Sequence, residues 1–254
     1  MEFLQFGGGD FGLFELDNIL NTIIQGDCLE TLKQIPDNSI DCVVTSPPYN
    51  KHYNRKKMYP ADNWSQYCID YEVFHDDMPE EEYQEWQKEL MQELVRIIKP
   101  KGSIFYNHKP RVVNHKVILP TEWLGEFNIR QVLIWDKRVT TQLTSIRWLP
   151  TVEYIYWITK TNIQPKFYNR SEHKFEIISI APEKMTEHPA SFPKKLIEVL
   201  VLNTTDKGDI VLDPFMGSGT TAFVCKKLFR NYIGVELNPK YIEYANKKLA
   251  SLLF

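Results

Sequence analysis

The stretch DIVLDPFMGSGTTA, residues 209–222, determines the fold that the sequence predicts. It begins with a short apolar run typical of a buried strand, continues through a glycine-rich turn and ends in a helical pattern. Gly217 and Gly219 permit a tight turn and a close approach of a ligand to the backbone, where a side chain would clash. The first turn of the helix offers backbone N–H groups that have no partner within the helix. The stretch therefore predicts a strand–turn–helix unit that holds a ligand at its turn.

Similar short apolar runs alternate with longer helical patterns along the rest of the chain. This alternation is typical of a mainly parallel sheet covered by helices. The run VEYIYWIT at 152–159 alternates in polarity and is aromatic, as in an antiparallel strand. We therefore expect an α/β fold, Rossmann-like and doubly wound, with a mostly parallel sheet and one antiparallel strand. The strand candidates are residues 22–25, 40–45, 103–107, 130–135, 152–159, 209–213 and 231–236.

The clearest helix is predicted over residues 79–99, where apolar residues from Tyr83 to Ile98 form one stripe. Asp77 is placed to cap this helix, and the Pro-Lys-Gly sequence at 100–102 is placed to end it. The other helices are expected after Pro193, near Gly219 and from Asn238-Pro239.

Length and composition indicate one globular domain. The chain has 254 residues, of which 43% are hydrophobic and 25% are charged, which is enough for one large α/β core. We expect a single domain over 1–254 with two polar insertions, at 50–77 and 160–187. The net charge of −3 gives no overall basic signature, so a nucleic acid would have to meet a local positive patch.

Four cysteines are spread along the chain without a C-x-x-C pair or the spacing of a metal site. We expect free thiols, no metal and a reducing, cytoplasmic location. Residues 1–18 lack a basic region and a long apolar run, so we expect an irregular arm there rather than a signal peptide. No run approaches the ~18 continuous apolar residues of a membrane span, so we expect no membrane partner. The cysteines are Cys28, Cys42, Cys68 and Cys225.

The string GSGTTA at 217–222 also fits the G-x-G-x-x-A pattern of dinucleotide-binding proteins. Glu236 ends the strand candidate that follows, where a carboxylate can accept hydrogen bonds from the hydroxyls of a ribose. A nicotinamide or flavin enzyme is therefore one alternative, and glycines that serve packing alone are another. Because only one helix can follow Glu236, a dinucleotide site would need earlier strands in a permuted order.

A second motif, VVTSPPYN at 43–50, joins the end of a predicted core strand to a turn with two prolines. Pro47 and Pro48 stiffen the turn and remove backbone donors. Ser46 and Tyr49 flank the prolines with a hydroxyl and an aromatic ring.

The two motifs together resemble the S-adenosylmethionine-dependent amino-methyltransferases of DNA, which methylate an exocyclic nitrogen of cytosine or adenine. Their circularly permuted order, with the proline motif first, is similar to that of the β class. The resemblance extends from Asp27 to about Tyr241. The matching segments are GDCLETL (26–32), TSPPYN (45–50), IKPKGSIFYNH (98–108), HPASFPKKL (188–196), DPFMGSGTT (213–221) and GVELNPKY (234–241).

The resemblance implies that Ser46 and the carbonyl of Pro47 accept the two hydrogens of the substrate amine. This tilts the nitrogen lone pair toward the methyl group, and Pro48 helps to preorganise the turn. Tyr49 would stack on a base swung out of the duplex. Serine at position 46 favours N4 of cytosine, whereas adenine enzymes more often carry Asp or Asn. Carbon-5 methylation is disfavoured because no cysteine of this chain follows a proline.

The resemblance also implies a set of cofactor contacts. Glu236 would bind the ribose of S-adenosylmethionine. Asp27 would accept from the adenine amino group, or would instead be the N-cap of a helix over 28–35. The segment 188–193 would close over the cofactor. The contacts to the methionine end would come from Asp213, Phe215, Gly217, Ser218, Gly219 and Thr220.

Double-stranded DNA is the expected partner, bound by local basic residues because phosphate neutralisation dominates affinity. One candidate patch follows the proline turn, and another lies in 137–147. The basic residues after the proline turn could instead be a solvated run of charges without a DNA contact. A homodimer and a separate cognate restriction endonuclease stay open. The candidate DNA contacts are Lys51, Arg55, Lys56, Lys57, Arg138 and Arg147.

Two other functions stay open besides a DNA amino-methyltransferase. The first is a permuted NAD-type oxidoreductase, and the second is a non-catalytic DNA-binding module that keeps the fold. RNA as the substrate is a variant of the main hypothesis.

Overall fold

The computed structural model describes residues 12–50, 77–140, 148–160, 162–183 and 192–252. These residues form one eight-stranded sheet and a separate two-stranded hairpin. Across the large sheet, the strands lie in the order β1 (Thr22–Gln25), β10 (Asn231–Glu236), β9 (Ile210–Asp213), β2 (Ile40–Thr45), β3 (Ile98–His108), β7 (Val152–Ile158), β6 (Ile129–Asp136) and β8 (Ile177–Ser179).

One strand of the large sheet runs against the others. β1, β10, β9, β2 and β3 are parallel to one another. β7 pairs antiparallel with both β3 and β6, and β8 is parallel to β6. β9 comes late in the chain but lies beside β2, as the permuted motif order requires. The predicted fold, a mostly parallel sheet with one antiparallel strand, is confirmed.

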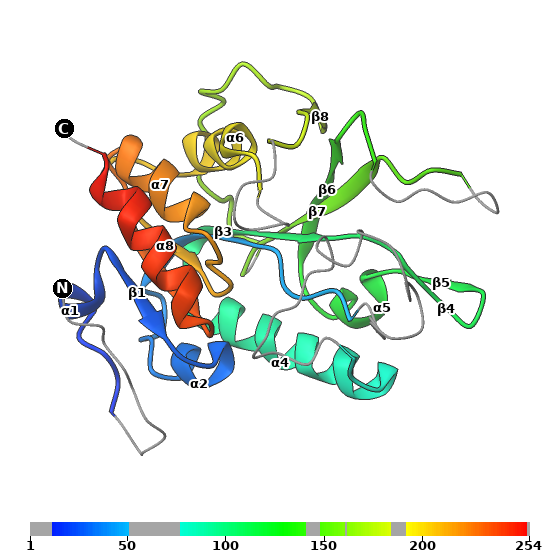
Figure 1. Ribbon diagram of the computed structural model, residues 1–254, viewed down its shortest axis with the longest axis horizontal. Coiled ribbons are helices and arrows are strands. Elements are labelled where there is room, and N and C mark those ends of the chain that lie inside the picture. The colour runs from blue at the N-terminus through cyan, green and yellow to red at the C-terminus, as the bar shows by residue number, and fades with distance from the viewer. Residues whose placement is uncertain (1–11, 51–76, 141–147, 161, 184–191, 253–254) are drawn as a thin grey trace, which may run out of the picture.

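Helices cover both faces of the sheet (Figure 1). On β2, Val43 packs into one buried core, whereas Cys42 and Val44 pack into the other. This two-sided burial explains why the run is continuously apolar. The first core contains residues of α1 (Leu16–Ile19), α2 (Cys28–Leu32), α4 (Glu80–Ile97) and α5 (Thr121–Leu124); the second contains residues of α6 (Lys194–Thr204), α7 (Thr220–Lys227) and α8 (Pro239–Ala250).

The ends of α4 differ from the sequence prediction. Asp77 does not cap the helix; the N-cap position is Pro79, which makes no side-chain cap hydrogen bond. The helix ends at Ile97, and β3 begins at the next residue. Pro100 therefore lies inside a strand, in an exposed segment beside a register shift in the β2–β3 pairing. A proline is tolerated there because the shift interrupts the regular hydrogen-bond ladder.

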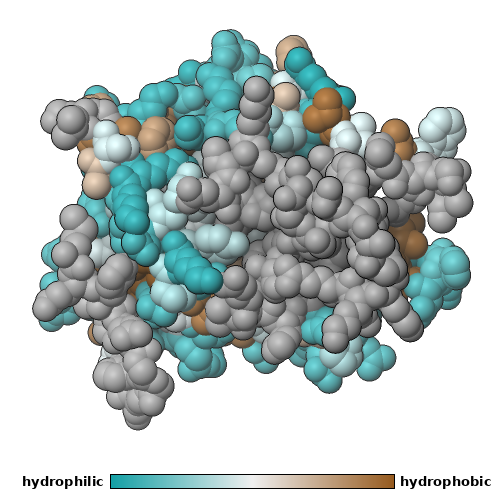
Figure 2. All heavy atoms as spheres, viewed as in Figure 1, coloured by the Kyte–Doolittle hydropathy of each residue, from teal (hydrophilic) through white to brown (hydrophobic). Residues whose placement is uncertain are grey.

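Three short strands were not predicted. β4 (Arg111–Val113) and β5 (Lys116–Ile118) form a hairpin whose turn residues, Asn114 and His115, have positive φ angles of 49° and 65°. Positive φ at both turn residues is the signature of a type I′ turn. β8 adds an edge strand within the predicted insertion 160–187. On the face shown in Figure 2, the described residues are mainly hydrophilic, with scattered apolar residues. Val132 of β6 and Ile177 of β8 are among the exposed apolar side chains.

The thiols of Cys28, Cys42 and Cys225 are free and buried, as predicted, and Cys68 lies outside the described residues. Burial raises the pKa of the Cys42 thiol to about 12, so this thiol stays protonated at neutral pH. Within the described ranges, no helix is both long enough and apolar enough to cross a membrane.

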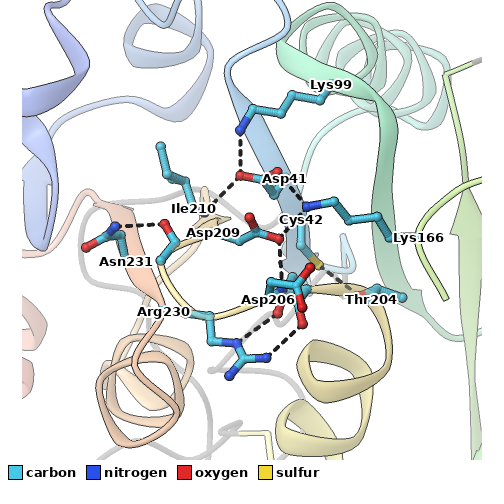
Figure 3. Close-up of polar contacts among 12 residues, drawn as sticks. Asp41, Cys42, Lys99, Lys166, Thr204, Asp206, Asp209, Ile210, Arg230 and Asn231 are labelled. Carbon is cyan, nitrogen blue, oxygen red and sulfur yellow. Dashed lines mark hydrogen bonds and ion pairs between the residues drawn. The ribbon is translucent and has the colours of Figure 1, made fainter. Parts of the chain in front are cut away.

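A buried ion-pair cluster ties the sheet together at the amino-terminal ends of its parallel strands (Figure 3). Asp41 of β2 is 4% exposed, and its carboxylate lies 2.7 Å from the Lys99 ammonium group and 3.5 Å from that of Lys166. The same carboxylate accepts a hydrogen bond of 3.0 Å from the backbone N–H of Ile210 in β9. Lys166 also pairs with Asp209 at 2.7 Å, so residues from the segment 160–187 are fastened to the central strands.

We expect Asp41→Ala to lower the free energy of unfolding by about 2 kcal/mol, because it leaves the half-buried N–H of Ile210 and two lysines without their common acceptor. Urea unfolding followed by circular dichroism measures the change. Glu243→Ala is the matched control, since Glu243 forms an exposed i,i+4 pair with Lys247, and its loss should leave the unfolding midpoint in urea nearly unchanged. Equal stability of Asp41→Ala and the parent would contradict this role.

Candidate active site

The proline and glycine motifs lie at the same edge of the sheet. β2 and β9 are adjacent and parallel, with Cys42 opposite Val211 and Val43 opposite Leu212. The chain therefore leaves both strands at their shared carboxyl edge, where open α/β sheets bind ligands. α4 contacts both loops: the Tyr83 hydroxyl donates to the carbonyl of Pro48 at 2.7 Å, and the rings of Trp86 and Phe215 lie 5.9 Å apart.

A hydrogen-bond network surrounds the hydroxyl of Ser46. The oxygen atoms of Ser46 and Tyr49 lie 2.7 Å apart, and the Tyr49 hydroxyl donates to Glu153 Oε2 at 3.2 Å. The side-chain amide of Asn107 donates to Tyr49 and to Glu153, both at 2.7 Å, and lies 3.4 Å from Ser46 Oγ. The ammonium group of Lys137 pairs with Glu153 Oε1 at 2.9 Å. We name Ser46, Tyr49, Asn107, Glu153 and Lys137 the hydroxyl network.

The network carries a buried charge. Burial acts to raise the pKa of Glu153, but Lys137, the Asn107 amide and Lys109 outweigh it and lower the pKa below its usual value. Glu153 is therefore ionised at neutral pH. Asn107 and Glu153 are functional candidates that the sequence prediction missed. The available signal was a single carboxylate within the aromatic strand VEYIYWIT.

The ring of Tyr49 is only 9% exposed and packs against His108, with ring centroids 4.5 Å apart. The ammonium group of Lys109 lies 5.6 Å from the centroid of the same ring. The ring is thus fixed by packing while its hydroxyl is fixed by the hydroxyl network. Stacking of a base on Tyr49 stays a prediction, and such a base would meet a ring whose orientation is already set.

Buried polar side chains of α4 and β3 hold the proline turn in place. Gln87 donates to the Tyr83 hydroxyl at 2.8 Å, and the Tyr106 hydroxyl donates to Gln87 Oε1 at 2.8 Å. Nε2 of His108 lies 2.7 Å from the Tyr83 hydroxyl. The sequence prediction placed Tyr83 only in an apolar stripe. In the structure its ring packs in the core while its hydroxyl holds the turn at Pro48.

The glycine motif forms the other half of the edge. Glu236, at the end of β10, accepts hydrogen bonds of 2.8 Å from the backbone N–H groups of Gly217 and Asn238, one on each carboxylate oxygen. Burial raises the pKa of Glu236. Asp213 accepts from the N–H of Phe215 at 3.1 Å and from the Thr221 hydroxyl at 2.6 Å.

Asp213 is an unusually weak acid in this structure. Burial raises its pKa to about 7, and the nearby Glu236 carboxylate adds to the effect, while Thr221 and the Phe215 N–H act in the opposite direction. A carboxyl group whose pKa is near neutral pH changes its protonation state when a charged ligand binds beside it. Such groups cluster at functional sites.

Both glycines of the turn need left-handed backbone. Gly217 has a φ of 51°, and Gly219, at the N-cap of α7, has a φ of 74°. A Cβ on Gly219 would also lie 2.7 Å from the Cβ of Ala245 in α8. The positive φ angle and the close packing against α8 therefore explain why position 219 is a glycine. Ser218 and Thr220 are buried, with their hydroxyl oxygens 3.5 Å apart.

Asp27 is the N-cap of α2, and its side chain accepts from the N–H of Glu30 at 3.1 Å. The capping alternative is thus confirmed, although α2 ends at Leu32 rather than at residue 35. Asp27 is exposed and follows β1, whose last residue, Gln25, pairs with Glu236. The carboxylates of Asp27 and Glu236 therefore stand at the ends of neighbouring strands.

Most candidate DNA contacts cannot be placed. Lys51, Arg55, Lys56, Lys57 and Arg147 lie outside the described residues, as does His188 in the predicted closing segment. Arg138 is described: it is exposed beyond β6, and its guanidinium group donates to the carbonyl of Ser179 in β8 at 3.1 Å. In the described part of the chain, no group of three or more His, Cys, Asp and Glu side chains could hold a metal ion.

Known proteins are similar to this chain in sequence and in fold. The profile of the N6_N4_Mtase family, described as DNA methylase, matches residues 40–247. The type II methyltransferase M.BglII of Bacillus subtilis is 32% identical, over 91% of this chain and 69% of the relative. Among solved structures, the PvuII DNA methyltransferase (cytosine-N4-specific) superposes with a TM-score of 0.70 at 22% identity, covering 91% of this chain and 86% of that one. The M1.HpyAVI–SAM complex superposes with a TM-score of 0.62 at 26% identity, covering 90% and 99%.

The matched region includes both motif loops and every strand of the shared edge except β1. The chain belongs to the N6/N4 DNA methylase family, whose members are S-adenosylmethionine-dependent DNA amino-methyltransferases.

Proposed function

We propose that this protein methylates the exocyclic N4 amine of cytosine in duplex DNA, with the target base swung out of the helix. The observation that carries the proposal is the half-buried Ser46 hydroxyl, which the hydroxyl network holds at the edge shared with the glycine motif. When bound, S-adenosylmethionine supplies the methyl group as a sulfonium electrophile.

The residues at the glycine motif fit this cofactor. Glu236 is half-buried, and each of its oxygens has capacity beyond the one backbone N–H that it accepts, so it can also accept from ribose hydroxyls. Asp27, at the end of the neighbouring strand, can accept from the adenine amino group. Asp213, with a pKa of about 7, can ionise when the methionine ammonium group arrives. Phe215, Gly217, Ser218, Gly219 and Thr220 complete the proposed set.

Ser46 and the Pro47 carbonyl act on the substrate amine. The lone pair of that nitrogen is delocalised into the ring, which makes it a poor nucleophile. Two acceptors placed in advance draw the amine hydrogens aside and direct the lone pair toward the methyl group. Pro48 and the buried Tyr83 keep the turn in place, because the Pro48 carbonyl is fixed by the Tyr83 hydroxyl.

The buried polar atoms at this position support a substrate site. Asn107 Oδ1 and Thr45 Oγ1 are buried and have no hydrogen-bond partner among the described residues. Buried polar atoms are nearly always satisfied in folded proteins. Two buried polar atoms without a partner therefore lie at the ends of β2 and β3, beside the position proposed for the substrate amine.

Cytosine is favoured over adenine by the serine at position 46, and the cytosine-N4-specific PvuII enzyme shares the fold. N6 of adenine is the second candidate, because the same two acceptors can serve either amine. For DNA contact we propose Lys51, Arg55, Lys56, Lys57, Arg138 and Arg147, with the insertions 50–77 and 160–187 as recognition segments. We propose a restriction–modification setting with a separately acting endonuclease, by similarity to the type II methyltransferase M.BglII. The free, buried thiols support a cytoplasmic location.

Product analysis tests the proposal. The protein is incubated with S-adenosylmethionine and unmethylated duplex DNA of mixed sequence, and the digested nucleosides are identified by mass. We expect N4-methyldeoxycytidine. N6-methyldeoxyadenosine would establish the second candidate, and no methylated nucleoside would overturn the proposal. Titration calorimetry with NAD excludes the oxidoreductase alternative if no heat is seen, and RNA in place of DNA tests the other substrate.

A further inference from the structure

We propose that Glu153, held by Lys137, fixes the direction of the hydroxyl protons in the network so that Ser46 Oγ offers its lone pairs to the substrate amine. Glu153 and Lys137 are then positioning residues that act through Tyr49 and Ser46. The proposal rests on the proposed function of Ser46 as an acceptor, which a separate variant tests.

The antiparallel strand explains how Glu153 reaches the site. β7 runs opposite to its neighbours, so its first residues lie at the carboxyl edge of the parallel strands. Glu153 is the second residue of β7 and pairs with Trp135 of β6, close to where the chain leaves β6 toward Lys137. Asn107, near the end of β3, pairs with Ile155 of the same antiparallel strand. Three strands thus bring the carboxylate, the amide and the ammonium group together.

The available protons determine which atom donates in each hydrogen bond of the hydroxyl network. Glu153 is ionised and can only accept, so the single hydroxyl proton of Tyr49 is donated to Glu153 Oε2 across 3.2 Å. The 2.7 Å contact between Tyr49 and Ser46 must then be bridged by the proton of Ser46. With its own proton directed inward, Ser46 Oγ keeps its lone pairs for a hydrogen of the substrate amine.

Asn107 reinforces the same direction. Its amide hydrogens go to Glu153 and Tyr49, both at 2.7 Å, so the Tyr49 oxygen already accepts one hydrogen and donates its own. The opposite amide orientation would place the Asn107 oxygen against the carboxylate and is therefore disfavoured. The groups facing Glu153 in the described structure are Lys137, Lys109, Tyr49 and Asn107. The two cations favour its ionised form.

A glutamine at this position removes the charge and keeps the size. In Glu153→Gln, the NH2 end of the new side chain must face either Lys137 or the Asn107 amide. Both of these groups are donors, and the NH2 end cannot accept a hydrogen bond from either. The direction of the Tyr49 and Ser46 protons is then no longer fixed. We expect kcat to fall about 100-fold, while the KM for DNA and the Kd for S-adenosylmethionine stay within about 3-fold.

The test compares four variants of the full chain: Ser46→Ala, Glu153→Gln, the double variant of both, and Glu243→Gln. We expect the double variant to match Ser46→Ala, because Glu153 acts only through Ser46. Glu243→Gln changes an exposed carboxylate of α8 and should have the parent kcat. If Ser46→Ala loses activity and Glu153→Gln keeps it, this inference is wrong and the proposed function stands. If Ser46→Ala keeps full activity, the proposed function itself fails.

A pH profile separates positioning from a general structural role. In Lys137→Ala, the buried Glu153 carboxylate loses its ion pair, so its pKa rises and the ionised form needs a higher pH. We expect the activity of Lys137→Ala to recover as the pH rises, with the acid limb of the kcat profile shifted upward relative to the parent. Parallel profiles with a uniform loss would overturn the inference, because a mere packing defect does not respond to protonation.

Discussion

Ser46→Ala is expected to lower kcat by two to three orders of magnitude, about the loss seen when one preorganised transition-state partner is removed. The hydroxyl lies beside Tyr49 and Asn107 in a polar network, and alanine removes one of the two atoms proposed to accept from the substrate amine. The acceptor matters most as the nitrogen lone pair turns toward the methyl group. The loss should therefore appear in kcat rather than in the KM for DNA.

Methyl transfer from radiolabelled S-adenosylmethionine to duplex DNA measures this effect. Ser251→Ala is the matched control, because Ser251 is exposed at the end of α8 and its hydroxyl donates to the nearby carbonyl of Lys248. The control should keep the parent rate. A Ser46→Ala enzyme within about 3-fold of the parent kcat would exclude the proposed role of this hydroxyl.

Glu236→Ala is expected to weaken the binding of S-adenosylmethionine at least about 100-fold. Each hydrogen bond to a charged acceptor contributes about 1.5–3 kcal/mol, and one carboxylate would accept from two ribose hydroxyls. The same substitution leaves the N–H groups of Gly217 and Asn238 without their acceptor, which loosens the glycine turn. Cofactor affinity should thus fall far more than the turnover of saturated enzyme.

Titration calorimetry measures the dissociation constant of the cofactor for each variant. Glu243→Ala, on the exposed face of α8, is the control and should bind as the parent does. Thermal melting shows whether the variant is folded at the temperature of the titration. A folded Glu236→Ala with the parent affinity would show that the cofactor does not use this carboxylate.

Local sequence patterns predicted β1, β2 and β10 well because their middle residues are buried. The bounds of β1, β2 and β10 match the predicted runs, since each continuous apolar segment ends where the chain turns. The predicted start of α4 agrees with the structure within one residue, but the predicted cap was wrong: the N-cap position is Pro79, and no side chain caps the helix. The β4–β5 hairpin was missed because its strands are short and its turn is Asn-His rather than a glycine pair.

The two motif loops could be assigned to one edge from sequence, but their supporting network could not. Asn107 and Glu153 come from strands that pair only after the sheet has formed. Asn107 lies in the matching segment 98–108 but had no predicted role there, and Glu153 lies in none of the matching segments. A lone glutamate in an aromatic strand becomes informative once its partner Lys137 is known. Polar contacts across a sheet depend on strand order and register, which local patterns do not contain.

The central claim is that the proline and glycine loops hold the base and the cofactor face to face. A crystal structure of the protein with S-adenosylhomocysteine and a duplex containing the methylated sequence tests this most directly. We predict that the cofactor sulfur lies between the Gly217 turn and Ser46, with N4 of the extruded cytosine within hydrogen-bond distance of Ser46 Oγ and the Pro47 carbonyl. A cofactor bound away from Glu236 and Gly217, or a target base held in a cavity that excludes Ser46, would contradict the account.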